Sequence, residues 1–317
     1  MDQSQEQTEQ PRSLVCEAIS AIRDGDLSQT QVARLSDLSR SNERALAAAW
    51  DSIPEGTRVD LVRRFDELSE ERVDLNFGRA LRIALGDRSA VVRQLAVAGL
   101  WEDESSDLLD RLRVILENDE SPDVQAQAAA ALERFAGKAA VGSLDDAVAS
   151  DLRDELRRSA SEAGAPYAVQ RRALESLGPY ASHPEIASLI SEAFDSADHG
   201  LQCSALYAMG RSQDSRWLPT ILEQLENEDP EIRFEAARAA GLLGSADALP
   251  VLLQAARDDD AEVRHTAISA ISQIGGRGAV RALERLAEDA GEADLELIQA
   301  AIDDVHTLLE PLQPPTS

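Results

Sequence analysis

The sequence predicts an all-α, right-handed solenoid of stacked antiparallel helix pairs. Two stretches, residues 229–243 and 260–274, repeat one pattern at an offset of 31 residues, and a fixed period in this range is typical of solenoids. Apolar residues fall at positions 0, +4, +5, +8 and +11 from an anchor residue, Ile232 or Val263. This spacing is one face of an α-helix. Aromatic residues make up only 3% of the chain, which disfavours a β-sandwich.

The sequence of the N-terminal part of the chain predicts a disordered tail followed by two capping helices. Residues 1–10 are polar and Gln-rich, and we expect them to be disordered. Residues 11–40 hold two amphipathic helices that we expect to cap the stack, because a terminal repeat needs one polar outer face. The repeats then occupy residues 41–309, and a Pro-rich tail, residues 310–317, ends the chain.

The anchors of the successive helices can be followed along the chain. Their spacings are 32, 45, 32, 31 and 31 residues, so one interval is longer than the others. The long interval predicts an insertion near residues 138–165 that contains an amphipathic helical segment, Leu144 to Ser159. The anchors are Val92, Val124, Val169, Leu201, Ile232 and Val263.

The clearest copies carry the motif D-x-x-[VI]-R-x-x-A. It stands as Asp229, Ile232, Arg233 and Ala236, and again as Asp260, Val263, Arg264 and Ala267. This pattern resembles HEAT repeats, especially the short class named after bilin lyases. The resemblance implies stacked helix pairs whose anchored helices line a concave surface. It indicates function only weakly, because such repeats serve scaffolds, adaptors and a few enzymes.

The charged residues of the motif predict a structural ladder along the stack. Asp229 and Asp260 stand where a side chain caps the first turn of a helix. We expect Arg233 and Arg264 to bond the capping Asp of their own or the next unit. Gln replaces this Arg in three central units, which should interrupt the ladder there; these residues are Gln125, Gln170 and Gln202.

Positions +2, +3 and +6 of the anchored helices are expected to be exposed, Glu175 and Cys203 among them. A patch of Arg beside aromatic residues is typical of interface hot spots. The alternative is that Tyr207 and Phe234 pack between adjacent helices. An acidic edge, Glu226–Glu231 with Asp258–Glu262, is a second candidate surface, suited to a basic partner. The predicted binding residues are Arg171, Arg172, Tyr207, Phe234, Arg238 and His265.

The sequence predicts no catalytic residues, no metal site and no cofactor. It contains neither a G-x-S-x-G elbow nor a P-loop. None of the four histidines forms H-E-x-x-H or pairs with a Cys at a familiar zinc spacing. The two cysteines, Cys16 and Cys203, share no motif.

The net charge limits the classes of partner that we expect. The net charge of −28 disfavours nucleic acid and anionic membranes, whose phosphates attract Lys and Arg. We expect a monomeric, cytoplasmic, non-enzymatic scaffold or adaptor that binds another protein or a peptide on its concave surface. The resemblance leaves two alternatives, a bilin lyase or isomerase-like enzyme and a HEAT-like DNA glycosylase. The glycosylases use a basic groove, which this acidic chain disfavours.

Overall fold

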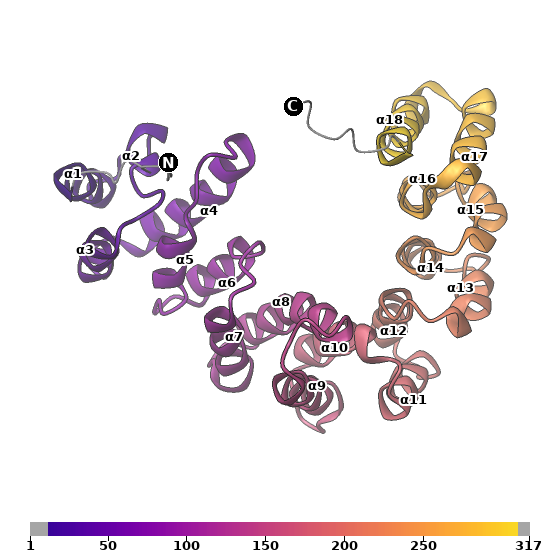
Figure 1. Cartoon of the computed structure of the whole chain (residues 1–317), viewed down its shortest axis with the longest axis horizontal. Coiled ribbons are helices and arrows are strands. Elements are labelled where there is room, and N and C mark those ends of the chain that lie inside the picture. The colour runs from indigo at the N-terminus through magenta and orange to yellow at the C-terminus, as the bar shows by residue number, and fades with distance from the viewer. Residues whose placement is uncertain (1–11, 310–317) are drawn as a thin grey trace, which may run out of the picture. The chain divides into compact units, whose positions relative to one another are not determined.

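A computed structural model describes residues 12–309 of the chain. Within this range the chain forms helices and their connections, with no β-strand. The predicted all-α solenoid is therefore confirmed: helices pack on neighbouring helices along the chain, as α11 does on α12 and α13 on α14 (Figure 1). The tails expected at residues 1–10 and 310–317 lie outside the described residues.

The chain divides into two compact units, and unit 1 comprises Met1–Leu132. Its odd-numbered helices α1, α3 and α5 contact one another in order, as do α2, α4 and α6. The last helix, α8 (Pro122–Ala140), contains the boundary between the units. The other helices of unit 1 are α1 (Arg12–Arg23), α2 (Gln29–Ala33), α3 (Arg40–Trp50), α4 (Glu55–Glu71), α5 (Gly78–Ala84), α6 (Ala90–Gly99) and α7 (Ser106–Asn118).

Unit 2 comprises Glu133–Ser317 and contains two rows of helices. The even-numbered row runs through α10, α12, α14, α16 and α18, and each odd-numbered helix from α9 to α17 packs on the even-numbered helix that follows it. In Figure 1 the even-numbered row lies on the inner side of the curve made by the helices of this unit. The helices are α9 (Asp146–Ser161), α10 (Tyr167–Ser176), α11 (Pro184–Phe194), α12 (His199–Arg211), α13 (Leu218–Gln224), α14 (Pro230–Leu243), α15 (Leu249–Ala255), α16 (Ala261–Ile274), α17 (Gly276–Asp289) and α18 (Glu292–Leu309).

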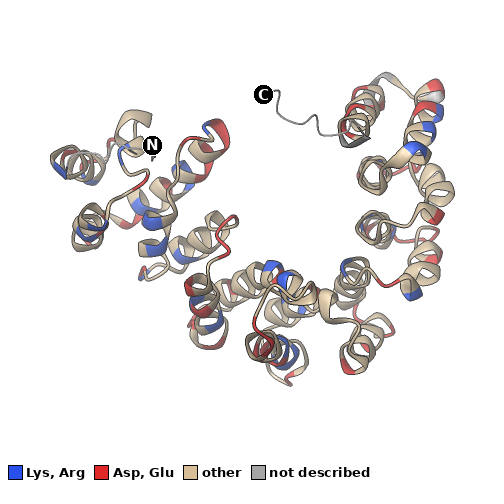
Figure 2. Ribbon diagram, viewed as in Figure 1, with Lys and Arg blue, Asp and Glu red and all other residues tan. Residues whose placement is uncertain are grey.

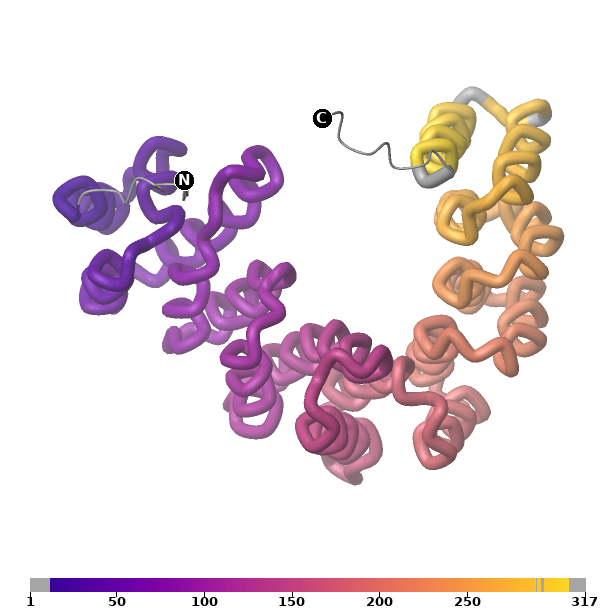
Figure 3. Tube along the Cα trace, in the orientation of Figure 1, coloured from indigo at the N-terminus to yellow at the C-terminus, as the bar shows by residue number. Residues whose placement is uncertain are grey.

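Three short 3₁₀ turns, η1 (Gly178–Tyr180), η2 (Ser215–Trp217) and η3 (Ala246–Ala248), lie in the connections of unit 2. The segment that lengthens the anchor spacing forms α9, which packs on α10. It therefore takes the place of an odd-numbered helix (Figure 3). The longer anchor spacing comes from the length of the helices, because α8 has 19 residues and α9 has 16.

The apolar positions of the anchored helices form the core. Five of the six anchors are buried, and Leu201 is half-buried. Position +4 is alanine in all six helices and has no exposed surface in any of them. So small a side chain lets neighbouring helices approach closely without leaving a cavity. These alanines are Ala96, Ala128, Ala173, Ala205, Ala236 and Ala267.

Glycine at position +9 sets the spacing of the even-numbered row. A Cβ added at Gly210 would lie 2.6 Å from the Cα of Ala239, and one added at Gly241 would lie 2.8 Å from the Cα of Ala270. Gly178 stands at the same distance from its anchor, Val169, and begins η1; a Cβ added there would lie 2.7 Å from the carbonyl oxygen of Ala208. Because no side chain fits there, the backbones of successive helices touch directly, and the row is held at a close distance.

Candidate functional site

The six predicted binding residues lie on four successive helices of the even-numbered row. Arg171 and Arg172 are on α10, Tyr207 on α12, and Phe234 with Arg238 on α14. These three helices pack in order, so the structure brings their residues onto one side of the row. The sixth residue, His265, is on α16. We call the cluster on α10, α12 and α14, with the acidic partners described below, the arginine–tyrosine patch.

The centre of the patch is the half-buried Tyr207. Its hydroxyl donates to both carboxylate oxygens of Glu133 on α8, at 3.1 and 3.0 Å. Glu133 also pairs with Arg211. The guanidinium of Arg238 lies over the Tyr207 ring, with its Cζ 4.2 Å from the ring centre. Burial, followed by the charge of Glu133, raises the pKa of Tyr207 to about 12, so the phenol stays neutral.

A chain of polar contacts joins α10 to α12 beside the tyrosine. The Nε of Arg171 donates to the Oγ of Ser204 at 3.0 Å, and this Oγ donates to Oε1 of Glu175 at 2.8 Å. Arg172 donates to Oε2 of the same carboxylate at 2.7 Å. Position +6 was expected to be exposed, but Glu175 is only 8% exposed. That expectation is wrong here because the carboxylate serves as the internal acceptor for two helices.

Buried carboxylates offset much of the positive charge expected on this surface. Glu235 on α14 lies near Arg238, and burial raises the pKa of this carboxyl above its usual value despite the neighbouring arginines. Four guanidinium groups thus share the patch with three carboxylates. The arginines are Arg171, Arg172, Arg211 and Arg238, and the carboxylates are Glu133, Glu175 and Glu235.

The side chains that remain open to solvent are fewer than the sequence predicted. The side chains of Arg172 and Arg238 are 52% and 44% exposed. Phe234 is half-buried and stands one helical turn before Arg238, so the two share a face of α14. Cys203, expected at an exposed position, is 2% exposed because position +2 of α12 faces α14.

The sixth predicted residue stands apart from this cluster. The Nε2 of His265 lies 3.0 Å from Oδ1 of Asp294, on α18, and Arg264 donates to the other oxygen of this carboxylate at 3.2 Å. The structure thus joins His265 to the neighbouring helix α18 through Asp294.

The ladder residues bond in a different register from the one expected. Asp229 and Asp260 each accept the backbone N–H two residues later, at 2.9 Å, and so cap α14 and α16. Arg233, however, forms two bonds of 2.7 and 2.8 Å with Asp258, which precedes the capping Asp260 by two residues. Arg264 reaches Asp294. The hydrogen bonds from Arg233 come first among the contacts that hold the pKa of Asp258 below its usual value.

The same contact recurs in unit 1, including one copy that the sequence analysis missed. Arg93 bonds Asp119 at 2.8 and 2.7 Å. Arg58 bonds Asp87 at 2.6 and 3.1 Å, and here the two side chains are only 8% and 1% exposed. Thr57 is the anchor of a degenerate copy of the repeat, so Arg58 stands at position +1, as Arg233 and Arg264 do. This position could have identified Arg58 as a ladder residue.

A family of repeats accounts for these recurring contacts. The sequence matches the HEAT-repeat family over residues 79–165 and 218–302, more than half of the chain. The chain belongs to the HEAT-repeat family. HEAT repeats commonly mediate protein–protein interactions. A comparison with curated protein sequences finds no match. Within the described residues, no helix combines the length and apolar character needed to cross a membrane.

Solved structures are similar to this chain at low sequence identity. The complex of CpcE and CpcF of phycocyanin lyase from Nostoc sp. PCC7120 is 16% identical, with a TM-score of 0.48; the match covers 72% of this chain and 94% of that chain. Human deoxyhypusine hydroxylase is 14% identical, with a TM-score of 0.36, over 93% and 98% of the two chains. An engineered protein is 18% identical, with a TM-score of 0.38, over 93% and 94%.

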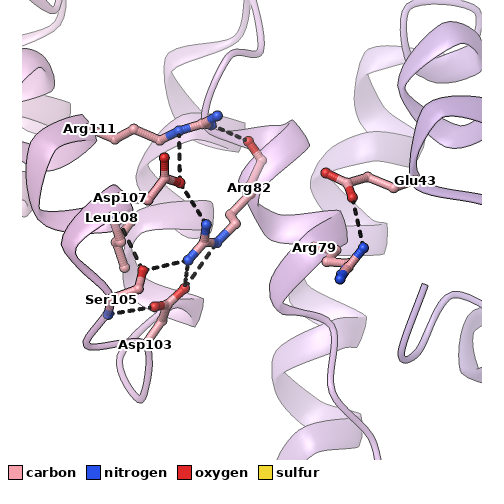
Figure 4. A network of polar contacts seen from close by, with 8 residues as sticks. All are labelled: Glu43, Arg79, Arg82, Asp103, Ser105, Asp107, Leu108 and Arg111. Atoms are coloured by element: carbon pink, nitrogen blue, oxygen red, sulfur yellow. Dashed lines mark hydrogen bonds and ion pairs between the residues drawn. The ribbon is translucent and has the colours of Figure 1, made fainter. Parts of the chain in front are cut away.

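The HEAT repeats of unit 1 also form an arginine-lined cavity that the sequence analysis did not identify. Its volume is about 710 Å³, and it lies at α3 and α5. Figure 4 shows Arg82 turned toward Asp103 and Asp107, with Nη2 2.6 Å from Asp103 and Nη1 2.7 Å from Asp107. Arg79 turns to Glu43 at 3.2 Å. Arginine forks match the geometry of carboxylates and phosphates. The basic residues of the cavity are Arg40, Arg44, Arg79 and Arg82.

Proposed function

We propose that this HEAT-repeat protein is a non-enzymatic scaffold that binds another protein or a peptide through the even-numbered row of unit 2. The observation that carries the proposal is the arginine–tyrosine patch, where Arg238 lies over Tyr207 on a row of helices held rigid by close packing. A guanidinium stacked on an aromatic ring loses little conformational freedom when a partner binds. Arg and Tyr are enriched among the residues that contribute most to interfaces.

The exposed atoms define the chemistry of the partner. The guanidinium groups of Arg172 and Arg238 are partly exposed, and each has N–H groups besides the one that pairs with Glu175 or Glu235. Phe234 adds apolar area on the same face as Arg238. Across the chain acidic residues far outnumber basic ones (Figure 2). A segment with carboxylates and one apolar side chain, in an extended conformation, suits this surface. A basic segment would instead be attracted to the acidic edge at Glu226–Glu231 and Asp258–Glu262.

Site-specific photo-crosslinking tests the location. A benzophenone amino acid replaces Phe234 in one protein and Val114 in the other, and both are irradiated in the native lysate. Val114 is 60% exposed on α7 and serves as the control. We expect one crosslinked protein at position 234 that is absent at position 114, identified by mass spectrometry.

Binding of the identified partner is then measured with purified variants. Phe234→Ser and Arg238→Gln should each weaken binding about tenfold or more, as expected for hot-spot residues. Arg277→Gln, at an exposed arginine of α17, should leave affinity unchanged. Circular dichroism checks that the helix content is intact. If the Phe234 and Arg238 variants bound at parental affinity, the proposed surface would be wrong, and a crosslink from position 228 would move the site to the acidic edge.

A further inference from the structure

A histidine, a cysteine and a glutamate converge at the start of α12 and α14. His199 is the first residue of α12, and Cys203 stands four residues later on the same face. Glu231 lies in the first turn of α14. One ligand atom from each of the three residues lies within 4.8 Å of the other two. The residues of H-x-x-x-C differ from those of H-E-x-x-H, but the spacing of four is the same, so a helix brings the two side chains together in the same way.

A second carboxylate, that of Asp229, lies on the other side of the His199 ring. Oδ2 of Asp229 lies 3.0 Å from Nε2 of His199, and Oε2 of Glu231 lies 3.7 Å from Nδ1 of the same ring. The Asp229 contact lacks hydrogen-bond geometry, and Nε2 is a buried nitrogen without a hydrogen-bond partner. The imidazole is therefore placed between two carboxylates, and one of its ring nitrogens has no acceptor or donor to satisfy it.

The surroundings of Cys203 favour a cation. The carboxylates of Glu231, Glu235 and Asp229 lie close enough to its sulfur to act on it electrostatically, and Arg171 supplies an opposing charge. Carboxylates thus dominate the potential at the sulfur. These carboxylates would attract a divalent cation, and a thiol that coordinates such an ion loses its proton.

The donor set selects the metal. Ca²⁺ and Mg²⁺ prefer oxygen ligands, whereas Zn²⁺ combines Cys, His and carboxylate ligands in a tetrahedron. Typical Zn–S and Zn–N distances place the donors about 3.3–3.6 Å apart. The present separations are within reach of small side-chain rotations, since His199 and Glu231 are 42% and 63% exposed and free to turn.

The site belongs to one repeat and is no general feature of the fold. At the positions equivalent to His199 and Cys203, the next repeat has Pro230 and Phe234, which cannot bind a metal. We propose that His199, Cys203 and Glu231 bind one Zn²⁺ that links the first turns of α12 and α14, while Asp229 holds the imidazole from its other ring nitrogen. The ion would fix the spacing of two helices that also carry the arginine–tyrosine patch.

Cobalt spectroscopy on the full chain provides the test, because Co²⁺ occupies the same nitrogen and sulfur sites and reports a bound thiolate. The protein is treated with chelator and reductant, and Co²⁺ is then titrated. We expect one equivalent to bind with an intense near-ultraviolet thiolate-to-cobalt band that Zn²⁺ removes. Zn²⁺ should also raise the thermal unfolding temperature. A parent protein without the band would overturn the proposal.

Matched variants assign the ligands. Cys203→Ser should abolish the band, with Cys203→Ala as the second variant if the serine protein does not fold. His199→Gln should weaken binding more than about 100-fold. Cys16→Ser, at the exposed and only other cysteine, should keep the band and the affinity. Asp229→Asn retains a helix cap but loses the charge beside the His199 ring, so it should weaken binding by about 10–100-fold, as expected for a residue that only positions a ligand. A band that survived in the Cys203 variants would refute the site.

Discussion

The buried ion pair of Arg58 and Asp87 makes the strongest prediction about stability. The Asp87 carboxylate accepts two bonds from Arg58, one from the indole N–H of Trp50 at 2.6 Å and one from the backbone N–H of Ser89 at 2.8 Å. Asp87→Asn removes the charge while keeping the size of the side chain. It leaves the Arg58 guanidinium, 8% exposed, without a counter-charge. Removal of one partner from a buried pair typically costs about 3–5 kcal/mol of unfolding free energy.

The chain contains a matched control for this substitution. Asp51 pairs with Arg88 at 2.8 Å, but these side chains are 63% and 80% exposed. Asp51→Asn should cost no more than about 1 kcal/mol, because water screens an exposed pair. Urea denaturation followed by circular dichroism measures both variants. Native-state hydrogen exchange then shows whether the loss is confined to the helices of unit 1, since repeat proteins need not unfold in a single step.

The pH dependence adds an independent check. Burial alone would raise the pKa of Asp87, but the hydrogen bonds from Arg58, Ser89 and Trp50 outweigh burial and hold the pKa below the usual 3.8. A carboxyl with a lowered folded-state pKa stabilises the fold above its unfolded pKa, and this contribution is lost as pH falls through the folded value. The difference between the parent and Asp87→Asn should therefore shrink as pH falls below 3.8. A cost equal to that of Asp51→Asn, or a difference that does not change with pH, would refute the reasoning.

Three further substitutions test the ladder and the close helix contacts. Arg233→Gln gives this position the residue found in the central repeats and removes both bonds to Asp258, so we expect a loss of about 1–3 kcal/mol in urea denaturation; an unchanged midpoint would mean that the pair contributes nothing. Gly210→Ala should cost about 1–3 kcal/mol because its Cβ would collide with Ala239. Gly137→Ala in α8, where a Cβ meets nothing within 4 Å, should instead stabilise the protein by up to about 1 kcal/mol; equal effects of the two alanines would contradict the packing argument.

The ladder residues show that sequence spacing predicts helix caps but not the partners of long side chains. The motif placed Asp229 and Asp260 at the helix starts, because a cap depends only on the chain within a few residues of it. The partner of Arg233 lies on the neighbouring repeat, and two aspartates there, Asp258 and Asp260, stand within reach of a long side chain. The Gln residues of the central repeats show the same limit: the amide of Gln202 reaches the backbone carbonyl of Ser196 in its own preceding turn.

The arginine–tyrosine patch was likewise predicted only in part from the sequence. Periodicity assigned Tyr207 and Arg238 to non-core positions, and stacking placed their helices side by side. Periodicity does not reveal that Glu133, 74 residues before Tyr207, supplies the acceptor for its hydroxyl. It also treats Glu175 and Cys203 as exposed, since a helical pattern locates the core on one side only, whereas a helix inside a row is covered on both flanks by its neighbours.

The sequence by itself determined the repeat, the helical class and the residues that fill the core. These depend on local periodicity, on caps and on small side chains at fixed positions, all of which a single chain segment specifies. Only the tertiary structure decided which charges are paired, which polar groups are buried, and that His199, Cys203 and Glu231 meet at one point. Those facts depend on the angle and distance between successive helices, which the backbone contacts at Gly210 and Gly241 set and which no spacing within one helix contains.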